Sequence, residues 1–162
     1  MRHTGLIAAI LVYSQSALAV DTVSTRLMTL PLATDIARAA VEACTRAGYQ
    51  VSAVVVDRSA VLQVAMRSVY ASRFTLELAE RKANAVVLSG VSSAEFRVNR
   101  GDIRDELHTL NEVLLLDGGL PVRAAGTLLG AIGVSGAPGG DKDETCAQAG
   151  LDAVEERLEF AD

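Results

Sequence analysis

The chain has 162 residues, enough for one domain with a hydrophobic core but too few for two domains of ordinary size. Half of the residues are apolar, yet only 4% are aromatic and none is Trp, so we expect an aliphatic core such as helices packed on a sheet provide. The net charge of -5 and the shortage of aromatic rings argue against nucleic acid as a partner, because phosphates are repelled and bases find few stacking surfaces.

Residues 1–19 have the three-part pattern of a secretory signal peptide. Arg2 and His3 form a short basic start, residues 6–12 are apolar but too few to span a bilayer, and Ala17-Leu18-Ala19 is a small-x-small cleavage pattern. We therefore expect a periplasmic or secreted protein that begins at Val20 and has no membrane partner after cleavage. The alternative is a misassigned start or a retained anchor. Cleavage leaves 14 Lys and Arg against 20 Asp and Glu, a net charge of -6.

The first half of the mature chain predicts a helix and then a hairpin. Residues 20–28 are polar and predict a flexible N-terminal arm, and residues 29–162 predict a single domain. A first helix is predicted from the cap residue Thr29 to Gly48, because apolar residues recur at helical spacing between them. Residues 51–57 and 61–67 are rich in β-branched or alternating apolar residues, which predicts two strands joined by a short turn.

A second helix is predicted to begin at Ala71 or Ser72. Its inner stripe consists of apolar residues at helical spacing, namely Leu76, Ala79, Ala83 and Val87. Four charged residues are expected on its other faces: Glu77, Glu80, Arg81 and Lys82.

The second half predicts further strands and a last helix. Residues 89–111 are polar and predict a loop with one or two short helical turns, and strands are predicted at 113–116, 122–125 and 128–135. Asp141 or Asp143 is expected to cap the last helix. Short links between consecutive strands permit only antiparallel pairing. The prediction is an α/β chain of the α+β type, with a five-stranded, mostly antiparallel sheet flanked by helices in the order α-β-β-α-β-β-β-α.

Residues 130–137 carry glycine at every third position within a predicted buried strand. Such a strand is approached closely by another group, which is either a packed helix or second subunit, or a ligand. The segment lacks the ending of a phosphate loop and the strand-to-helix placement of a dinucleotide motif, so it is no nucleotide signature.

Two cysteines, Cys44 and Cys146, fall in the first and last predicted helices of a chain with an export signal. A disulfide between them is possible, but we expect two buried free cysteines, because free cysteine is among the most buried residue types. Two cysteines and one mature histidine form no zinc pattern.

Five motifs in order resemble the GlcG/HbpS/PduO-C-terminal family of haem-binding-like proteins, over about residues 30–160. They are Val51–Asp57, Glu80-Arg81-Lys82-Ala83, Gly118–Val122, Gly130–Ala137 and Asp143–Gly150. The resemblance implies an α/β fold, homo-oligomers, and haem or a related tetrapyrrole as the ligand of some members. The chain departs from the family at Ala60, where glycine is usual, and at residues 67–71, where Arg-x-Asp-Gly-Ala is usual.

Candidate ligand-binding residues lie at four places. His108, the only mature histidine, is a candidate axial haem ligand, with a solvated surface histidine as the alternative; Tyr70, Met66 and Cys44 are weaker candidates. Arg67 and Tyr70 lie at the mouth between the second strand and second helix. Glu77 and Glu80, three residues apart on a helix, can present two carboxylates to a metal ion, and the resemblance suggests iron. Gly139 and Gly140 precede the last helix, where free backbone amides can bind a propionate or other carboxylate.

These observations predict an exported, homo-oligomeric protein that binds a small molecule, haem or a related tetrapyrrole, for sequestration, sensing or delivery. The alternative is an enzyme or enzyme accessory that acts on a small organic acid or in haem degradation, with a purely structural assembly as a third possibility. No catalytic residue is assigned, because the sequence contains nothing like a catalytic triad or nucleophile elbow.

Overall fold

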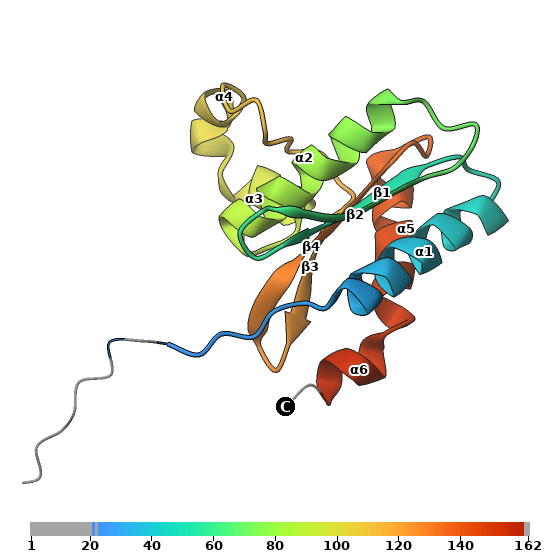
Figure 1. The fold of residues 1–162 in the computed structure, drawn as a ribbon. Helices are drawn as coiled ribbons and strands as arrows, with labels where there is room; N and C mark the ends of the chain where they lie inside the picture. Colours follow the sequence, from blue (N-terminus) through green and yellow to red (C-terminus); the bar gives the residue numbers. More distant parts are fainter. Residues whose placement is uncertain (1–20, 22, 161–162) are drawn as a thin grey trace, which may run out of the picture.

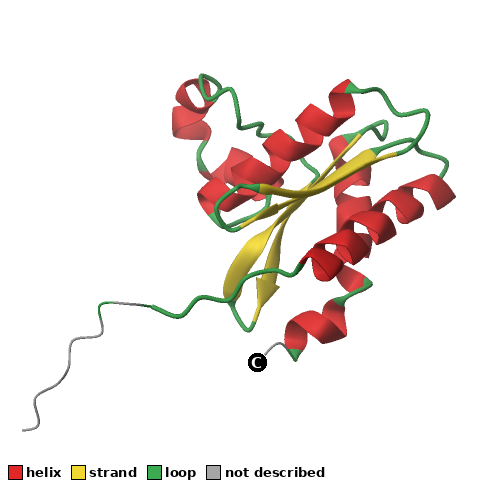
Figure 2. Ribbon diagram, in the orientation of Figure 1, coloured by secondary structure: helices red, strands yellow, loops and turns green. Residues whose placement is uncertain are grey.

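The computed structural model describes residue 21 and residues 23–160, so the predicted signal peptide lies outside the described residues. The described part forms one antiparallel sheet of four strands with helices on both faces (Figures 1 and 2). The predicted α+β class and antiparallel pairing are therefore confirmed. The elements are α1 (Leu30–Arg46), β1 (Ser52–Asp57), β2 (Leu62–Arg67), α2 (Phe74–Ser89), α3 (Ser93–Asn99), the 3-10 turn η1 (Gly101–Ile103), α4 (Arg104–Leu107), β3 (Gly119–Ala124), β4 (Thr127–Ser135), α5 (Gly140–Asp152) and α6 (Glu155–Glu159).

The strands lie in the order β2-β1-β4-β3, with β1 and β4 in the centre. Ser52 at the start of β1 pairs with Ser135 at the end of β4, and Asp57 pairs with Gly130. Pro121 lies in the edge strand β3, where its missing N–H costs no ladder hydrogen bond. No helix in the described part of the chain is long and apolar enough to cross a bilayer.

The predicted strand at 113–116 is wrong, which reduces the sheet from five strands to four. Val113 and Leu115 are instead buried in a small cluster with Phe96 and Leu107, beneath the segment that carries α3, η1 and α4. The short helical turns predicted in this segment are present. A short apolar run can be buried under a loop as well as in a sheet, and its periodicity does not distinguish the two.

The two faces of the sheet carry different helices. Side chains alternate along the central strands, so that Val55 and Ile132 face α1 and α5 while Val54 and Ala131 face α2. Figure 1 shows α2 on one side of the sheet and α1 with α5 on the other. The molecule thus has three layers, with the sheet as the middle one.

Gly133 in β4 shows what approaches the glycine-rich strand. A Cβ atom on this residue would lie 1.9 Å from the carbonyl oxygen of Ala79 in α2. Real Cβ atoms essentially never come so close to an oxygen, so only glycine fits at this position. The group packed on the middle of the strand is therefore helix α2 of the same chain. Of the two expectations, a packed helix or subunit and a ligand, the first holds at Gly133.

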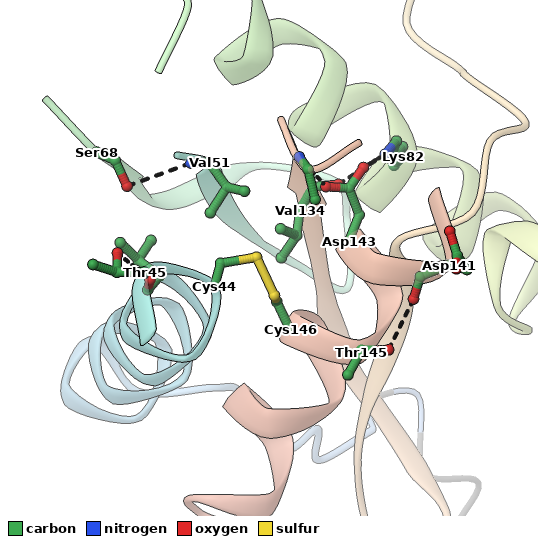
Figure 3. The surroundings of a disulfide bond; sticks show 12 residues. Cys44, Thr45, Val51, Ser68, Lys82, Val134, Asp141, Asp143, Thr145 and Cys146 are labelled. Carbon is green, nitrogen blue, oxygen red and sulfur yellow. Dashed lines mark hydrogen bonds and ion pairs between the residues drawn. A yellow bond between two sulfur atoms is a disulfide. The ribbon is translucent and has the colours of Figure 1, made fainter. Parts of the chain in front are cut away.

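Cys44 of α1 and Cys146 of α5 form a disulfide, with a Cα–Cα distance of 5.5 Å (Figure 3). Our expectation of two free cysteines was wrong. Both residues are buried as expected, but α1 and α5 pack side by side on the same sheet face and bring the two sulfurs together. The sequence alone could not show that contact.

Candidate functional site

A groove of about 890 Å³ runs along the outer face of α2. Its other walls are the β1–β2 turn, at Ser59 and Ala60, and the loop of residues 109–113. We call it the α2 groove. Its polar and charged lining from α2 is Glu77, Glu80, Arg81 and Asn84, and its apolar lining is Val87, Leu88, Leu110 and Val113. Such a mixed lining and volume are typical of small-molecule sites.

Three hydrogen bonds fix the 109–113 loop and the residue after it on α2. The backbone N–H of Leu114 donates to the carbonyl oxygen of Arg81 at 3.0 Å. The side chain of Arg81 donates to the carbonyl of Val113 at 3.4 Å, and the Asn84 amide donates to the carbonyl of Glu112 at 3.0 Å. These bonds fix the loop wall of the groove relative to α2.

Two buried polar atoms of this groove have no hydrogen-bond partner within the described residues. They are Nε of Arg81, a donor, and Oδ1 of Asn84, an acceptor. Nη1 of Arg81 lies 3.6 Å from Oε1 of Glu77, so the guanidinium is only partly engaged. Both atoms are covered by the protein, so a ligand would contact Arg81 and Asn84 through the exposed parts of their side chains. Sequence reasoning missed both as site residues.

Glu77 and Glu80 lie together in the groove, as their helical spacing predicted. Within the described residues, no three His, Cys, Asp or Glu side chains are grouped so as to hold a metal ion. A cation bound by these two carboxylates would need its remaining ligands from water or from another molecule.

His108 lies at the edge of the groove. It is exposed and follows the last residue of α4, and the next residue, Thr109, lines the groove. Its backbone N–H donates to the carbonyl of Arg104 at 3.0 Å, which fixes the end of the short helix. His108 itself is not part of the groove lining, but it is adjacent in sequence to Thr109, which is.

Arg67 and Tyr70 lie away from the groove lining, in the connection between β2 and α2. Nη1 of Arg67 donates to the backbone carbonyls of Ser68 at 3.2 Å, Val69 at 3.1 Å, and Ala71. This guanidinium therefore shapes its own loop. Tyr70 is 86% exposed. Cys44, a weaker candidate for haem ligation, is unavailable because it forms the disulfide.

A buried ion pair that the sequence did not reveal joins α2 to α5. Nζ of Lys82 lies 2.7 Å from Oδ2 of Asp143, and it also donates to the carbonyl of Val134 at 2.9 Å (Figure 3). Oδ1 of Asp143 accepts from the backbone N–H of Ala137 at 2.9 Å. Burial raises the pKa of the Asp143 carboxyl, and the ion pair with Lys82 and the bond from Ala137 offset this only in part.

Two expectations are corrected by this pair. Lys82 was assigned to an outer face of the second helix, but it is 2% exposed and lies beside the inner residues Ala79 and Ala83. Asp141 or Asp143 was expected to cap α5, but the cap position is Gly139 and no side chain caps the helix. The position of Lys82 next to the inner residue Ala83 was the one sequence signal that it is buried. Its partner Asp143 lies in a distant helix and could not be predicted from residue spacing.

Gly139 and Gly140 line a second cavity, of about 390 Å³, at the start of α5. We call it the α5 cavity. Its wall from α2 consists of Thr75, Leu78 and Lys82, whereas the α2 groove is lined by residues two positions further round the helix, such as Glu77 and Glu80. The predicted glycines and the predicted glutamates therefore belong to different sites.

The fold and its sites define a class of small α+β proteins with a central antiparallel sheet and a ligand-sized groove on one helix. Residues 28–152 match the family described as haem degrading protein HbpS-like. The chain belongs to this HbpS-like family, as the resemblance in its motifs implied.

Solved structures of similar proteins agree with this assignment. A crystal structure of HbpS has 38% identity and a TM-score of 0.77, over 86% of this chain and 98% of its own. Streptomyces reticuli HbpS, in a double mutant with two glutamates three residues apart each replaced by aspartate, has 35% identity and a TM-score of 0.77, over 88% of this chain and 97% of its own. A PduOC:haem complex has 26% identity and a TM-score of 0.70, over 79% of this chain and 95% of its own. A search of curated proteins gives no match.

Proposed function

We propose that this protein is exported, forms homo-oligomers, and binds haem or a related tetrapyrrole in the α2 groove for sequestration, sensing or delivery. The observation that carries the proposal is a groove of ligand size in a chain whose relatives include a protein solved as a haem complex. Family membership supports the class of ligand, and the groove supplies a place for it.

The groove has the groups that a tetrapyrrole needs. The apolar side chains of Leu88, Leu110 and Val113 offer a surface for the macrocycle, and the partly exposed guanidinium of Arg81 offers a positive charge for a propionate. His108 at the edge offers an imidazole as axial ligand. Glu77 and Glu80 have the same three-residue spacing as the two glutamates replaced in the Streptomyces reticuli protein. The proposal includes iron bound by these two carboxylates, as the family resemblance of the sequence suggests.

Export is supported by the buried disulfide as well as by the signal-peptide pattern. Disulfides persist in oxidising compartments and are rare in the cytosol, and Cys44 and Cys146 form one here. Both observations favour a periplasmic or extracellular location for the mature protein.

The test is a titration of the purified, haem-free mature protein with hemin, followed by the Soret band. We expect the shift to saturate at a fixed ratio of haem to subunit, and His108→Ala to weaken binding. Arg104→Ala, an exposed change in the same short helix and outside the groove lining, is the matched control. A titration without a saturable shift would contradict the proposal.

Haem degradation is the second candidate function, favoured by the description of the matching family. It is tested by adding peroxide or a reductant to the haem-loaded protein. Bleaching no faster than that of free hemin would leave binding as the function and exclude degradation under those conditions.

A further inference from the structure

Ser135, the last residue of β4, has an unused hydroxyl in the α5 cavity. The residue is only 5% exposed and lines the cavity, yet its hydroxyl has no hydrogen-bond partner among the described residues. Ser52, which pairs with Ser135 on the neighbouring strand β1, does have a partner: its hydroxyl is hydrogen-bonded to that of Thr75 at 2.8 Å. The Ser135 hydroxyl is not sealed off by the protein, so it is open to bond with water or with a ligand in the cavity.

The start of α5 presents further donors to the same space. The helix has 13 residues, and no side chain caps it. The backbone amides of Gly140 and Asp141 have no acceptor within the described part of the chain. Gly139 and Gly140 line the cavity, so the positive end of the helix dipole lies at its wall.

Lys82 adds a cation to the same cavity. An ammonium group has three N–H donors, and the bonds to Asp143 and to the Val134 carbonyl occupy two of them. Both oxygens of Asp143 are also occupied, by Lys82 and by the amide of Ala137. Oδ1 of Asp117, which also lines the cavity, makes no hydrogen bond but lies 2.8 Å from Nη2 of Arg97 in an ion pair. The groups without any partner are therefore donors, which favours an acceptor ligand.

The charges around the cavity limit the charge of that ligand. Lys82 is balanced by Asp143, and Arg97 by Asp117 at 2.8 Å. With both cations neutralised, the helix N-terminus and the neutral donors favour a single negative charge. A phosphate dianion would be repelled by two nearby carboxylates.

We propose that the α5 cavity binds the carboxylate of a small organic monoacid, held by the Ser135 hydroxyl, the Gly140 amide and the third N–H of Lys82. The volume of about 390 Å³ is suited to a small molecule and is less than half that of the α2 groove. This site is separate from the proposed haem site and does not depend on it.

The test uses haem-free mature protein labelled with ¹⁵N-glycine and titrated with acetate at constant pH and ionic strength. We expect saturable shifts in the amide signals of Gly139 and Gly140. Ser135→Ala removes the hydroxyl without altering the ion pair, and we expect it to weaken acetate binding by about 2- to 10-fold, the effect of one hydrogen bond. Ser59→Ala, the same change in the α2 groove, is the matched control and should bind acetate as the wild type does.

The outcomes separate clearly. Shifts that do not saturate, shifts spread over all the glycines, or equal affinity of Ser135→Ala and wild type would overturn the site. Phosphate binding as tightly as acetate would overturn the monoacid assignment. Because no haem is present, failure of the haem titration would leave this result unaffected.

Discussion

Lys82 and Asp143 form a 2.7 Å ion pair between helices that lie on opposite faces of the sheet. The pair passes the end of β4, where Lys82 also bonds to the carbonyl of Val134. Gly118 makes room for it, because a Cβ there would lie 2.8 Å from Cβ of Asp143 and 3.1 Å from Nζ of Lys82. The three layers of the fold are thus joined at one buried polar point.

Lys82→Met should reduce the free energy of unfolding by about 3–5 kcal/mol, because it leaves the buried Asp143 without its partner. The double variant Lys82→Met/Asp143→Leu should lose less than Lys82→Met alone, since no uncompensated charge remains. Denaturant unfolding measures both changes. Arg157→Met is the matched control: it breaks an ion pair with Asp35 of equal length, 2.7 Å, that is exposed to solvent, and should cost less than about 1 kcal/mol. Equal losses for the buried and exposed pairs would refute the argument.

The pH dependence of stability should show the raised pKa of Asp143. Burial raises this pKa above its ordinary value of 3.8, so the folded protein binds the proton more tightly than the unfolded chain does. The contribution of Asp143 to stability is therefore greatest below pH 3.8 and falls as the pH rises through its folded-state pKa. Unfolding free energies of wild type and Asp143→Asn, compared from about pH 3 to about pH 7, should show the wild-type advantage declining with rising pH. An advantage that grows with pH would mean that the ion pair outweighs burial.

Much of the fold follows from local patterns. Helices α1 and α2 and strands β1, β2 and β4 lie close to where their apolar patterns predicted them. Each helix buries one stripe on the sheet, whereas the central strands β1 and β4 are buried on both faces. The predicted strand at 113–116 failed because Val113 and Leu115 are buried by α3 and α4, and such a contact leaves no periodic signal. Glycine at position 133 was correctly interpreted as a close approach, although the approaching helix could not be named.

The sites were less accessible to sequence reasoning. Glu77 and Glu80 share the α2 groove because residues three apart on a helix are neighbours whatever the rest of the fold does. Arg67 and Gly139 come from different connections, before α2 and before α5, and of these two residues only Gly139 lines the α5 cavity. The pairs Lys82–Asp143 and Cys44–Cys146 depend on contacts between distant helices, which spacing within one helix does not encode.

Gly133→Ala should lower the free energy of unfolding by about 1–3 kcal/mol or more, because the new methyl group would collide with the backbone of α2. Neither main chain can move away without disturbing the core. Gly101→Ala is the matched control, since a Cβ at Gly101 meets no atom within 4 Å. Thermal or denaturant unfolding of the two variants compares the same change at a packed and an open position. A neutral Gly133→Ala would show that α2 can retreat from the sheet.

The disulfide should contribute substantially to stability, because it closes a loop with a sequence separation of 102 residues. Cys44→Ala/Cys146→Ala should lower the free energy of unfolding by about 2–5 kcal/mol. The reduced wild-type protein is the control, and should unfold near the midpoint of the double variant. A thiol titration of the unreduced, denatured wild type should find no free thiol; finding two would contradict the pairing.

The proposed iron site is tested by Glu77→Gln/Glu80→Gln, which should weaken iron binding by about tenfold or more, because the proposed site loses two anionic oxygen ligands. The fold should be unaffected, since neither residue is buried. Glu77→Asp/Glu80→Asp retains both charges but shortens each side chain by one methylene group.

If the positions of the oxygens matter, this variant also binds iron more weakly than the wild type. If charge alone attracts the metal, it binds iron as the wild type does. The control is Glu156→Gln/Glu159→Gln, two exposed glutamates at the same spacing on α6. Calorimetric titration with iron under anaerobic conditions measures all four proteins, and equal loss in the α6 variant would show that general surface charge, and not the α2 groove, attracts the metal.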